Sequence, residues 1–149
     1  MARRFDSQST TDQVLEGIDC TGKVAIVTGA SGGLGAETAR ALASRGARVT
    51  LTARDTAKAA GVAETIRAAH PGAELDVREL TLDRPDSVRA FAKGWLADNR
   101  TLHLLLNNAG VMACPLARTA EGWEQQFATN HLGHFLLTGL LFPALKAGA

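Results

Sequence analysis

Four closely spaced glycines after an apolar run are the residues of this chain best suited to hold a phosphate. The largely apolar residues 23–27 lead into the sequence Thr28-Gly29-Ala30-Ser31-Gly32-Gly33-Leu34-Gly35, and a helix-like stretch follows directly. A strand that ends in glycines and becomes a helix presents unpaired N–H groups and about half a positive charge to an anion. The pattern is therefore typical of a phosphate-binding turn.

Three of these glycines have separate expected tasks. Gly29 permits the sharp turn because a residue without Cβ can adopt a positive φ. Gly33 lets the main chain approach a pyrophosphate, and Gly35 lets the new helix pack closely on the strand. Any strand-to-helix turn can use glycine, but a second β-like run, residues 47–52, ends about 20 residues later, where a ribose-reading residue belongs. The sequence therefore predicts a dinucleotide-binding βαβ unit.

Strands and helices alternate along most of the chain, which predicts an α/β protein with a parallel sheet. The predicted strands cover residues 23–28, 47–53, 74–80 and 102–106. The third is expected at an edge with one wet side, and the fourth, which is the most hydrophobic, is expected to be central. The predicted helices cover residues 36–45, 56–69, 86–98 and 121–145, the last with an interruption near Pro143. The expected strand order is 3-2-1-4, one mononucleotide half of a doubly wound sheet.

Local signals support two of these helices. Asp55 can cap the helix over residues 56–69, and His70-Pro71-Gly72 closes it. An apolar stripe at helical spacing predicts the buried face of the helix over residues 86–98. The stripe consists of Val88, Phe91, Ala92 and Trp95.

Composition excludes several other classes of protein. The net charge of +1 gives no general attraction to nucleic acid or to an anionic membrane. Cys20 and Cys114 have neither metal-site nor redox spacing, which favours two free thiols in a reducing cytoplasm. Residues 1–19 are predicted to form a lead-in arm, and residues 20–149 the dinucleotide-binding domain. No secretory signal or membrane span is recognised, so the cytoplasm is the expected location.

Three motifs, in order and suitably separated, resemble those of the short-chain dehydrogenase/reductase family. They are Thr28-Gly29-x-x-x-Gly33-x-Gly35, Asn107-Asn108-Ala109-Gly110 and Asn130-His131-Leu132-Gly133-His134-Phe135. The chain most resembles the branch that includes retinol dehydrogenases, WW-domain oxidoreductases and protochlorophyllide reductases. The resemblance implies a Rossmann-type doubly wound sheet with helices on both faces, of which this chain holds the N-terminal half. It also implies hydride transfer between a nicotinamide and a small-molecule carbonyl or alcohol.

The resemblance assigns most cofactor contacts to the glycine-rich loop and to the Asn-Asn-Ala-Gly turn. The implied cofactor-binding residues are Gly29, Ser31, Gly32, Gly33, Leu34, Gly35, Arg54, Thr81, Leu82, Asn107, Asn108, Ala109 and Gly110. A plain tight turn is the alternative explanation for Asn107 and Asn108, because asparagine tolerates such bends. Asn130 matches the family's catalytic helix asparagine, which holds a water in the proton relay. The alternative for Asn130 is an ordinary polar residue early in a helix.

Ala53 and Arg54 predict which dinucleotide is preferred. NAD-preferring relatives place an aspartate at the position of Ala53, where it would repel a 2′-phosphate, whereas a guanidinium can hold that phosphate through two hydrogen bonds. We therefore predict NADP(H), with NAD(H) as the alternative cofactor and a solvated Arg54 paired with Asp55 as the competing interpretation. Thr81 occupies the position of an adenine-contacting aspartate, and Asp83 lies two residues out of register, so looser adenine binding is expected.

The long helix carries two histidines, His131 and His134, which lie three residues apart and within reach of each other. Two imidazoles could begin a metal site, but no third ligand has suitable spacing, so no metal site is predicted. Packing or hydrogen bonding is the expected role of both side chains.

The chain contains no tyrosine. In the family, a tyrosine–lysine pair moves the proton and a serine orients the substrate, and both come from segments after the long helix. We therefore interpret the chain as the cofactor-binding portion of an NADP-dependent oxidoreductase, truncated after that helix and inactive by itself. The alternative is a non-catalytic dinucleotide-binding or interaction module. A Rossmann methyltransferase is disfavoured because it would need an acid near the end of the second strand.

The helix predicted over residues 121–145 carries more apolar side chains than one small sheet can cover. In complete relatives this helix packs in a dimer interface. The resemblance therefore implies a homodimer formed through this helix.

Overall fold

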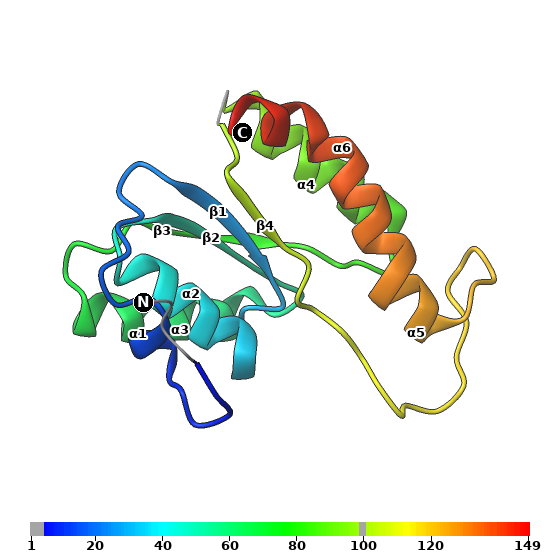
Figure 1. Ribbon diagram of the computed structural model, residues 1–149. Coiled ribbons are helices and arrows are strands. Elements are labelled where there is room, and N and C mark those ends of the chain that lie inside the picture. Colours follow the sequence, from blue (N-terminus) through cyan, green and yellow to red (C-terminus); the bar gives the residue numbers. More distant parts are fainter. Residues whose placement is uncertain (1–4, 99–100) are drawn as a thin grey trace.

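Four parallel strands form the centre of the protein in the computed structural model, which describes residues 5–98 and 101–149. The strands are β1 (Val24–Thr28), β2 (Arg48–Ala53), β3 (Leu75–Glu79) and β4 (Leu104–Leu106). Their order across the sheet is β3-β2-β1-β4 (Figure 1). The predicted α/β class, parallel arrangement and strand order are therefore confirmed.

Six α-helical segments and one π-helical turn are described beside these strands. They are α1 (Thr11–Val14), α2 (Gly33–Ala43), α3 (Thr56–Ala69), α4 (Pro85–Ala97), α5 (Gln125–Phe127), η1 (Ala128–Leu132) and α6 (Gly133–Ala147). Local signals fix several of their starts. The Asp55 carboxylate accepts a hydrogen bond from the Lys58 N–H at 2.9 Å and caps α3, while Pro85 occupies the first turn of α4.

Helices cover both faces of the sheet (Figure 1), and two hydrophobic clusters, one on each face, hold the elements together. The face covered by α2 and α3 contains small helix residues such as Ala39 and Ala63, which allow close packing on β1 and β2. The face covered by α4 and α6 contains larger side chains, including Trp95 and Leu137, packed around Ile26. The two hydrophobic layers therefore differ in the size of the helix side chains that form them.

The short helix α1 lies against α2 through polar contacts. One terminal guanidinium nitrogen of Arg40 lies 2.9 Å from an Asp12 carboxylate oxygen and 2.8 Å from a Glu37 carboxylate oxygen. The Thr11 hydroxyl donates to the same Glu37 carboxylate. These hydrogen bonds, chiefly the one from Arg40, lower the pKa of Glu37 to about 2. The segment before the glycine-rich loop is thus attached to α2.

Strand β4 lies at the end of the four-strand order, as the predicted order 3-2-1-4 requires, and not in the central position that its hydrophobicity predicts. Within the described residues it is an edge strand, paired with β1 on one side only. The apolar run serves two purposes, because only part of it lies in the strand. Leu102 is fully buried before the strand begins, in the cluster with α4 and α6, whereas Leu104 is 38% exposed on the strand itself.

The long helix also differs from the prediction of one helix over residues 121–145. It starts at Gln125, because the Glu124 carboxylate accepts hydrogen bonds from the Gln126 and Phe127 N–H groups at 2.9 and 2.7 Å. Its irregular part is the π-helical turn η1, and α6 continues through Pro143. The helix tolerates this proline because Gly139, whose carbonyl loses its donor, is exposed to solvent, as is Pro143 itself.

Candidate functional site

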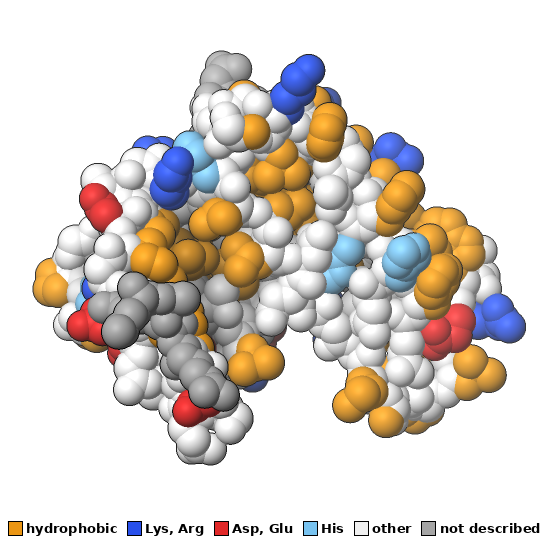
Figure 2. Space-filling model, viewed as in Figure 1, with side chains coloured by type: hydrophobic (Ala, Val, Ile, Leu, Met, Phe, Trp, Pro, Cys, Tyr) orange, Lys and Arg blue, Asp and Glu red, His pale blue; other side chains and the backbone are white. Residues whose placement is uncertain are grey.

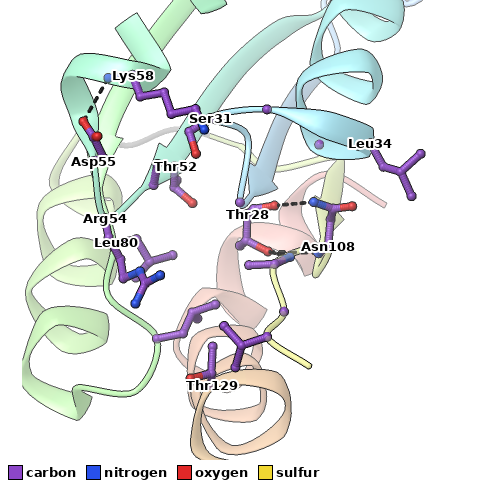
Figure 3. Close-up of a pocket in the computed structure, with 18 of the residues that line it drawn as sticks. Thr28, Ser31, Leu34, Thr52, Arg54, Asp55, Lys58, Leu80, Asn108 and Thr129 are labelled. Atoms are coloured by element: carbon purple, nitrogen blue, oxygen red, sulfur yellow. Dashed lines mark hydrogen bonds between the residues drawn. The ribbon is translucent and has the colours of Figure 1, made fainter. Parts of the chain in front are cut away.

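A cavity of about 560 Å³ opens where the strands end at their carboxyl side. The glycine-rich loop after β1, the end of β2, and the loops after β3 and β4 all contribute to its wall (Figure 3). Figure 2 shows the corresponding notch between the part of the surface that carries α2 and the part that carries α5. In open α/β sheets, ligands bind in this crevice outside the carboxyl ends of the strands.

The structure brings most of the residues predicted to bind a cofactor to this one cavity. Those on its wall are Gly29, Ser31, Gly32, Leu34, Gly35, Arg54, Leu82, Asn108, Ala109 and Gly110. Three predicted cofactor-binding residues, Gly33, Thr81 and Asn107, do not line it, and neither does Asn130, which was predicted to be catalytic. The residues that line the cavity come from four segments that are far apart in the sequence, which is the arrangement a large ligand requires.

The glycine-rich loop has the geometry of an anion cradle. Gly29 adopts a φ of +68°, and a Cβ there would lie 2.8 Å from the Cα of Ala109. A Cβ on Gly35 would collide with the Gly29 carbonyl oxygen and lie 2.6 Å from the Asn108 amide nitrogen. The N-terminus of α2 has no side-chain cap, unlike that of α3, so its first N–H groups remain open to an anion. The loop therefore fits a diphosphate group.

Two cations lie on the wall near this loop. Arg54 follows β2, and Lys58 lies in the first turn of α3, with its ammonium 3.9 Å from where a Gly32 Cβ would be. Figure 3 shows Lys58 extending toward Ser31 and Arg54 lying beside Leu80. Sequence reasoning missed Lys58, although a signal for it was present. Lys58 is a basic residue four positions after Arg54, in the first turn of a helix that starts beside the predicted site.

On the far side of the cavity, the structure places Asp83 rather than Thr81 on the wall. The Thr81 N–H donates to the Ser87 hydroxyl at 3.0 Å, which holds this residue toward the start of α4. Asp83 accepts a hydrogen bond from the Gln125 amide at 3.2 Å. The sequence placed Asp83 two residues away from the position of the adenine-contacting aspartate. The loop after β3 nevertheless brings the Asp83 carboxylate, and not Thr81, to the cavity.

The Asn-Asn-Ala-Gly turn is held to the end of β1 by Thr28. The Thr28 hydroxyl oxygen lies 2.9 Å from both the Asn108 and the Ala109 N–H nitrogens. The Asn108 side-chain amide donates to the Thr28 carbonyl at 2.8 Å. Asn107 instead points to α6 and donates to the Thr138 hydroxyl at 3.1 Å. The turn is thus a braced part of the wall, and sequence reasoning gave Thr28 no such role.

Asn130 lies on η1 and fixes the segment after this turn. Its side-chain oxygen accepts from the Val111 N–H, and its side-chain nitrogen donates to the Val111 carbonyl, both at 2.8 Å. The Asn130 amide thus pairs with the backbone of Val111 as a residue of a neighbouring β-strand would. Since Val111 lines the cavity and Asn130 does not, the side chain of Asn130 acts on the cavity through Val111.

The two histidines of the long helix have different surroundings. The exposed His131 ring stacks between Phe127 and Phe135, with ring centroids 5.0 and 6.3 Å apart. His134 is buried, and burial lowers its pKa, so the ring is neutral at pH 7. Among residues 5–98 and 101–149, no three His, Cys, Asp or Glu side chains are grouped in a way that could hold a metal ion.

Comparison with known proteins identifies the family. The family model for short chain dehydrogenases matches residues 23–149. The chain belongs to the short-chain dehydrogenase family. This family is one of oxidoreductases that bind a nicotinamide dinucleotide, and the cavity of this short-chain dehydrogenase chain lies where such a cofactor binds in an open α/β sheet.

Similar proteins include retinol dehydrogenases. The chain is 51% identical over 132 residues to human retinol dehydrogenase 12, which covers 89% of this chain and 42% of that protein. It is 46% identical over 145 residues to the chloroplastic short-chain dehydrogenase TIC 32 B of Brassica napus, which covers 97% of this chain and 45% of that protein. The chain therefore spans less than half the length of these two relatives.

A solved structure is similar in fold as well as in sequence. It is a metagenomic short-chain oxidoreductase in complex with NADP, with a TM-score of 0.73 and 42% sequence identity, and the match covers 85% of this chain and 58% of that one.

Within the described part of this chain, no helix combines the length and the apolar character that crossing a membrane would require.

Proposed function

We propose that this chain is the NADP(H)-binding portion of a short-chain oxidoreductase that transfers hydride between the nicotinamide and a small-molecule carbonyl or alcohol. Residues 20–149 would form its dinucleotide-binding domain and residues 5–19 an arm before it, while residues 1–4 of the predicted arm lie outside the described residues. The observation that carries the proposal is the cavity itself, which brings an uncapped helix N-terminus, a glycine cradle and two cations together.

The charges on the cavity wall support NADP(H) over NAD(H). The residue at the end of β2 is Ala53, so no carboxylate is present there to repel a 2′-phosphate. Arg54 and Lys58 can approach the same phosphate from the end of β2 and from the first turn of α3. The nearby Asp55 carboxylate caps α3 and is therefore turned toward its own helix.

When bound, the nicotinamide would supply the hydride, and this chain's residues would bind and orient the dinucleotide. The loop from Gly29 to Gly35 would hold the diphosphate, and Asn108 to Val111 would line the wall beside it. The chain contains no tyrosine, so it cannot provide the Tyr-x-x-x-Lys proton donor that the family resemblance implies. We therefore expect dinucleotide binding without turnover from this chain alone.

Calorimetric titration with NADPH and then NADH tests the proposal. We expect tighter binding of NADPH, and we expect Arg54→Ala and Lys58→Ala each to weaken it by about tenfold while changing NADH binding little. Arg89→Ala is the matched control, because this exposed arginine lies on α4 and does not line the cavity. Equal affinity for both dinucleotides would overturn the NADP preference, and a folded chain that binds neither would overturn the proposed function.

A non-catalytic dinucleotide-binding or interaction module is the second candidate, and the absence of tyrosine is the observation that favours it. The coding sequence downstream of Ala149 separates the two candidates. A following segment with a serine and a Tyr-x-x-x-Lys supports the oxidoreductase, whereas a stop codon supports the module.

We also propose that the outer face of α5 and α6 packs against a second copy of the protein. Phe127, Phe135 and Phe142 are 53%, 74% and 60% exposed on these helices. Figure 2 shows hydrophobic side chains along this part of the surface. Large contiguous apolar patches are uncommon on monomers and mark interaction sites, which supports the homodimer that the family resemblance implies.

A further inference from the structure

The buried His134 has no place in the proposed cofactor contacts, yet it contacts Thr28, a residue of the cavity wall. Its Nε2 lies 2.8 Å from the Thr28 hydroxyl oxygen, and its Nδ1 lies 3.1 Å from the Asn130 carbonyl oxygen. His134 does not line the cavity. Its ring, at the start of α6, instead connects Asn130 of the π-helical turn to Thr28 at the end of β1, and His134 and Thr28 are 106 residues apart in the sequence.

The hydrogen-bond partners of the ring decide its tautomer. A carbonyl oxygen can only accept, so the proton of the neutral ring is on Nδ1, which donates to Asn130. Nε2 therefore carries a lone pair and accepts the single hydroxyl proton of Thr28. The Leu106 carbonyl is a competing acceptor for that proton, but it is farther away, at 3.2 Å.

With its proton directed to His134, the Thr28 hydroxyl has two lone pairs left. They match the two N–H groups that approach it, from Asn108 and Ala109, each at 2.9 Å. The other tautomer would bring a third N–H group to an oxygen that can accept only two, and it would turn the Nδ1 lone pair toward a carbonyl oxygen. Only the Nδ1–H form satisfies all of these groups.

We propose that His134 is a positioning residue that fixes the Thr28 hydroxyl and thereby holds the Asn-Asn-Ala-Gly turn in its cofactor-binding position. Ala109 would touch a Cβ at Gly29 and also lines the cavity, so a shift of this turn would alter the wall next to the glycine-rich loop. The lowered pKa of the buried ring agrees with this role, because a neutral ring can accept from Thr28.

Nitrogen-15 NMR of the histidine rings, combined with amide hydrogen exchange, tests the proposal without a cofactor. We expect His134 in the Nδ1–H form and expect His134→Phe to speed exchange at Asn108 and Ala109. His131→Phe is the matched control, because His131 is exposed and contacts neither Thr28 nor the turn. An Nε2–H ring in the wild type would overturn the proposal, as would unchanged exchange in a folded His134→Phe.

The effect on cofactor affinity rests on the proposed function and forms a second arm. We expect His134→Phe to weaken NADPH binding by about tenfold and Thr28→Val to weaken it more, because Thr28→Val also removes the acceptor of the Asn108 and Ala109 N–H groups. The double variant should lose little more than Thr28→Val alone, because His134 acts through the Thr28 hydroxyl. Thr28→Ser keeps the hydroxyl and should restore affinity. If the losses of NADPH affinity in the two single variants add up in the double variant, the proposed coupling between His134 and Thr28 is wrong. A wild-type chain that shows the Nδ1–H ring and protected amides but binds no NADPH would refute only the proposed function.

Discussion

The two faces of the sheet differ in how their hydrophobic layers are built. The α2–α3 face is formed by residues close in sequence, and the contacts of Ala39 and Ala63 with the sheet belong to consecutive βαβ units. The α4–α6 face needs the last helix of the chain to return across the sheet, so Leu137 packs near Trp95. The helices of the first face expose Leu34 beside the glycine-rich loop, whereas those of the second expose the larger Phe135 and Phe142. Local order in the sequence thus encodes one face well and the other incompletely.

The largest expected effect comes from removing the central side chain of the α4–α6 face. Trp95 is fully buried, and its indole N–H donates to the Thr50 hydroxyl at 3.4 Å. We expect Trp95→Ala to lower the free energy of unfolding by about 3–5 kcal/mol, measured by urea denaturation. Trp123→Ala is the control, since Trp123 is 40% exposed and should change stability by about 0.5 kcal/mol or less. Similar losses in the two variants would contradict this description of the core.

A smaller effect is expected on the opposite face, where α2 closely approaches the strand end. Gly35→Ala should lower the free energy of unfolding by about 1–3 kcal/mol, because the new Cβ meets the Gly29 carbonyl and the Asn108 side chain. The same change at Gly61 on α3 meets no atom within 4 Å and should stabilise the helix by about 0.5–1 kcal/mol. Thermal denaturation of both variants would show whether close packing, rather than helix propensity, requires glycine at position 35.

The α4–α6 face should also respond to pH in a way that the other face does not. Burial lowers the pKa of His134 below 6.5, so the unfolded chain binds more protons than the folded chain as the pH falls below that value. The unfolding free energy should therefore decrease from pH 7 toward acid, and His134→Phe should remove part of this slope. Glu37 would contribute separately and at lower pH, between 4.5 and about 2. A slope unchanged by His134→Phe would contradict a buried neutral ring.

The smallest effect on stability is expected at the exposed part of the second face. Phe135→Glu should change the unfolding free energy by about 0.5 kcal/mol or less, because this side chain is 74% exposed. It should nevertheless disrupt the proposed homodimer by placing a charge in an apolar contact. Analytical ultracentrifugation of the wild type and the variant measures this difference. A wild-type chain that stays monomeric at high concentration would contradict the homodimer.

Much of the fold could be predicted because short-range signals were sufficient. The α3 helix covers the predicted residues 56–69 because Asp55 caps it and His70-Pro71-Gly72 ends it. The predicted stripe of α4 is also buried, since helical spacing alone brings those four apolar residues to one side. The strand order followed from the alternation of strands and helices.

The details of the site were less accessible to sequence reasoning. Arg54 was recognised by its place after a strand, but the contribution of Lys58 depends on the direction in which α3 leaves that strand. Nothing in the sequence distinguished Glu124 from the other charged residues. Its hydrogen bonds nevertheless start the long helix at Gln125, and not at the predicted residue 121. In both cases the side chain's role depends on a backbone direction that the residue type does not specify.

The sequence by itself determined the glycine cradle, because it depends on the spacing of residues along one segment, and the order of the strands, because strands and helices alternate in the pattern of one mononucleotide-binding half. Only the tertiary structure decided that His134 meets Thr28, 106 residues away, while His131 three positions earlier faces solvent. Spacing along a helix cannot settle this, because the π-helical turn before α6 changes which side chains face the sheet. The same turn carries Asn130, so a local irregularity of the backbone places both residues that brace the cavity wall.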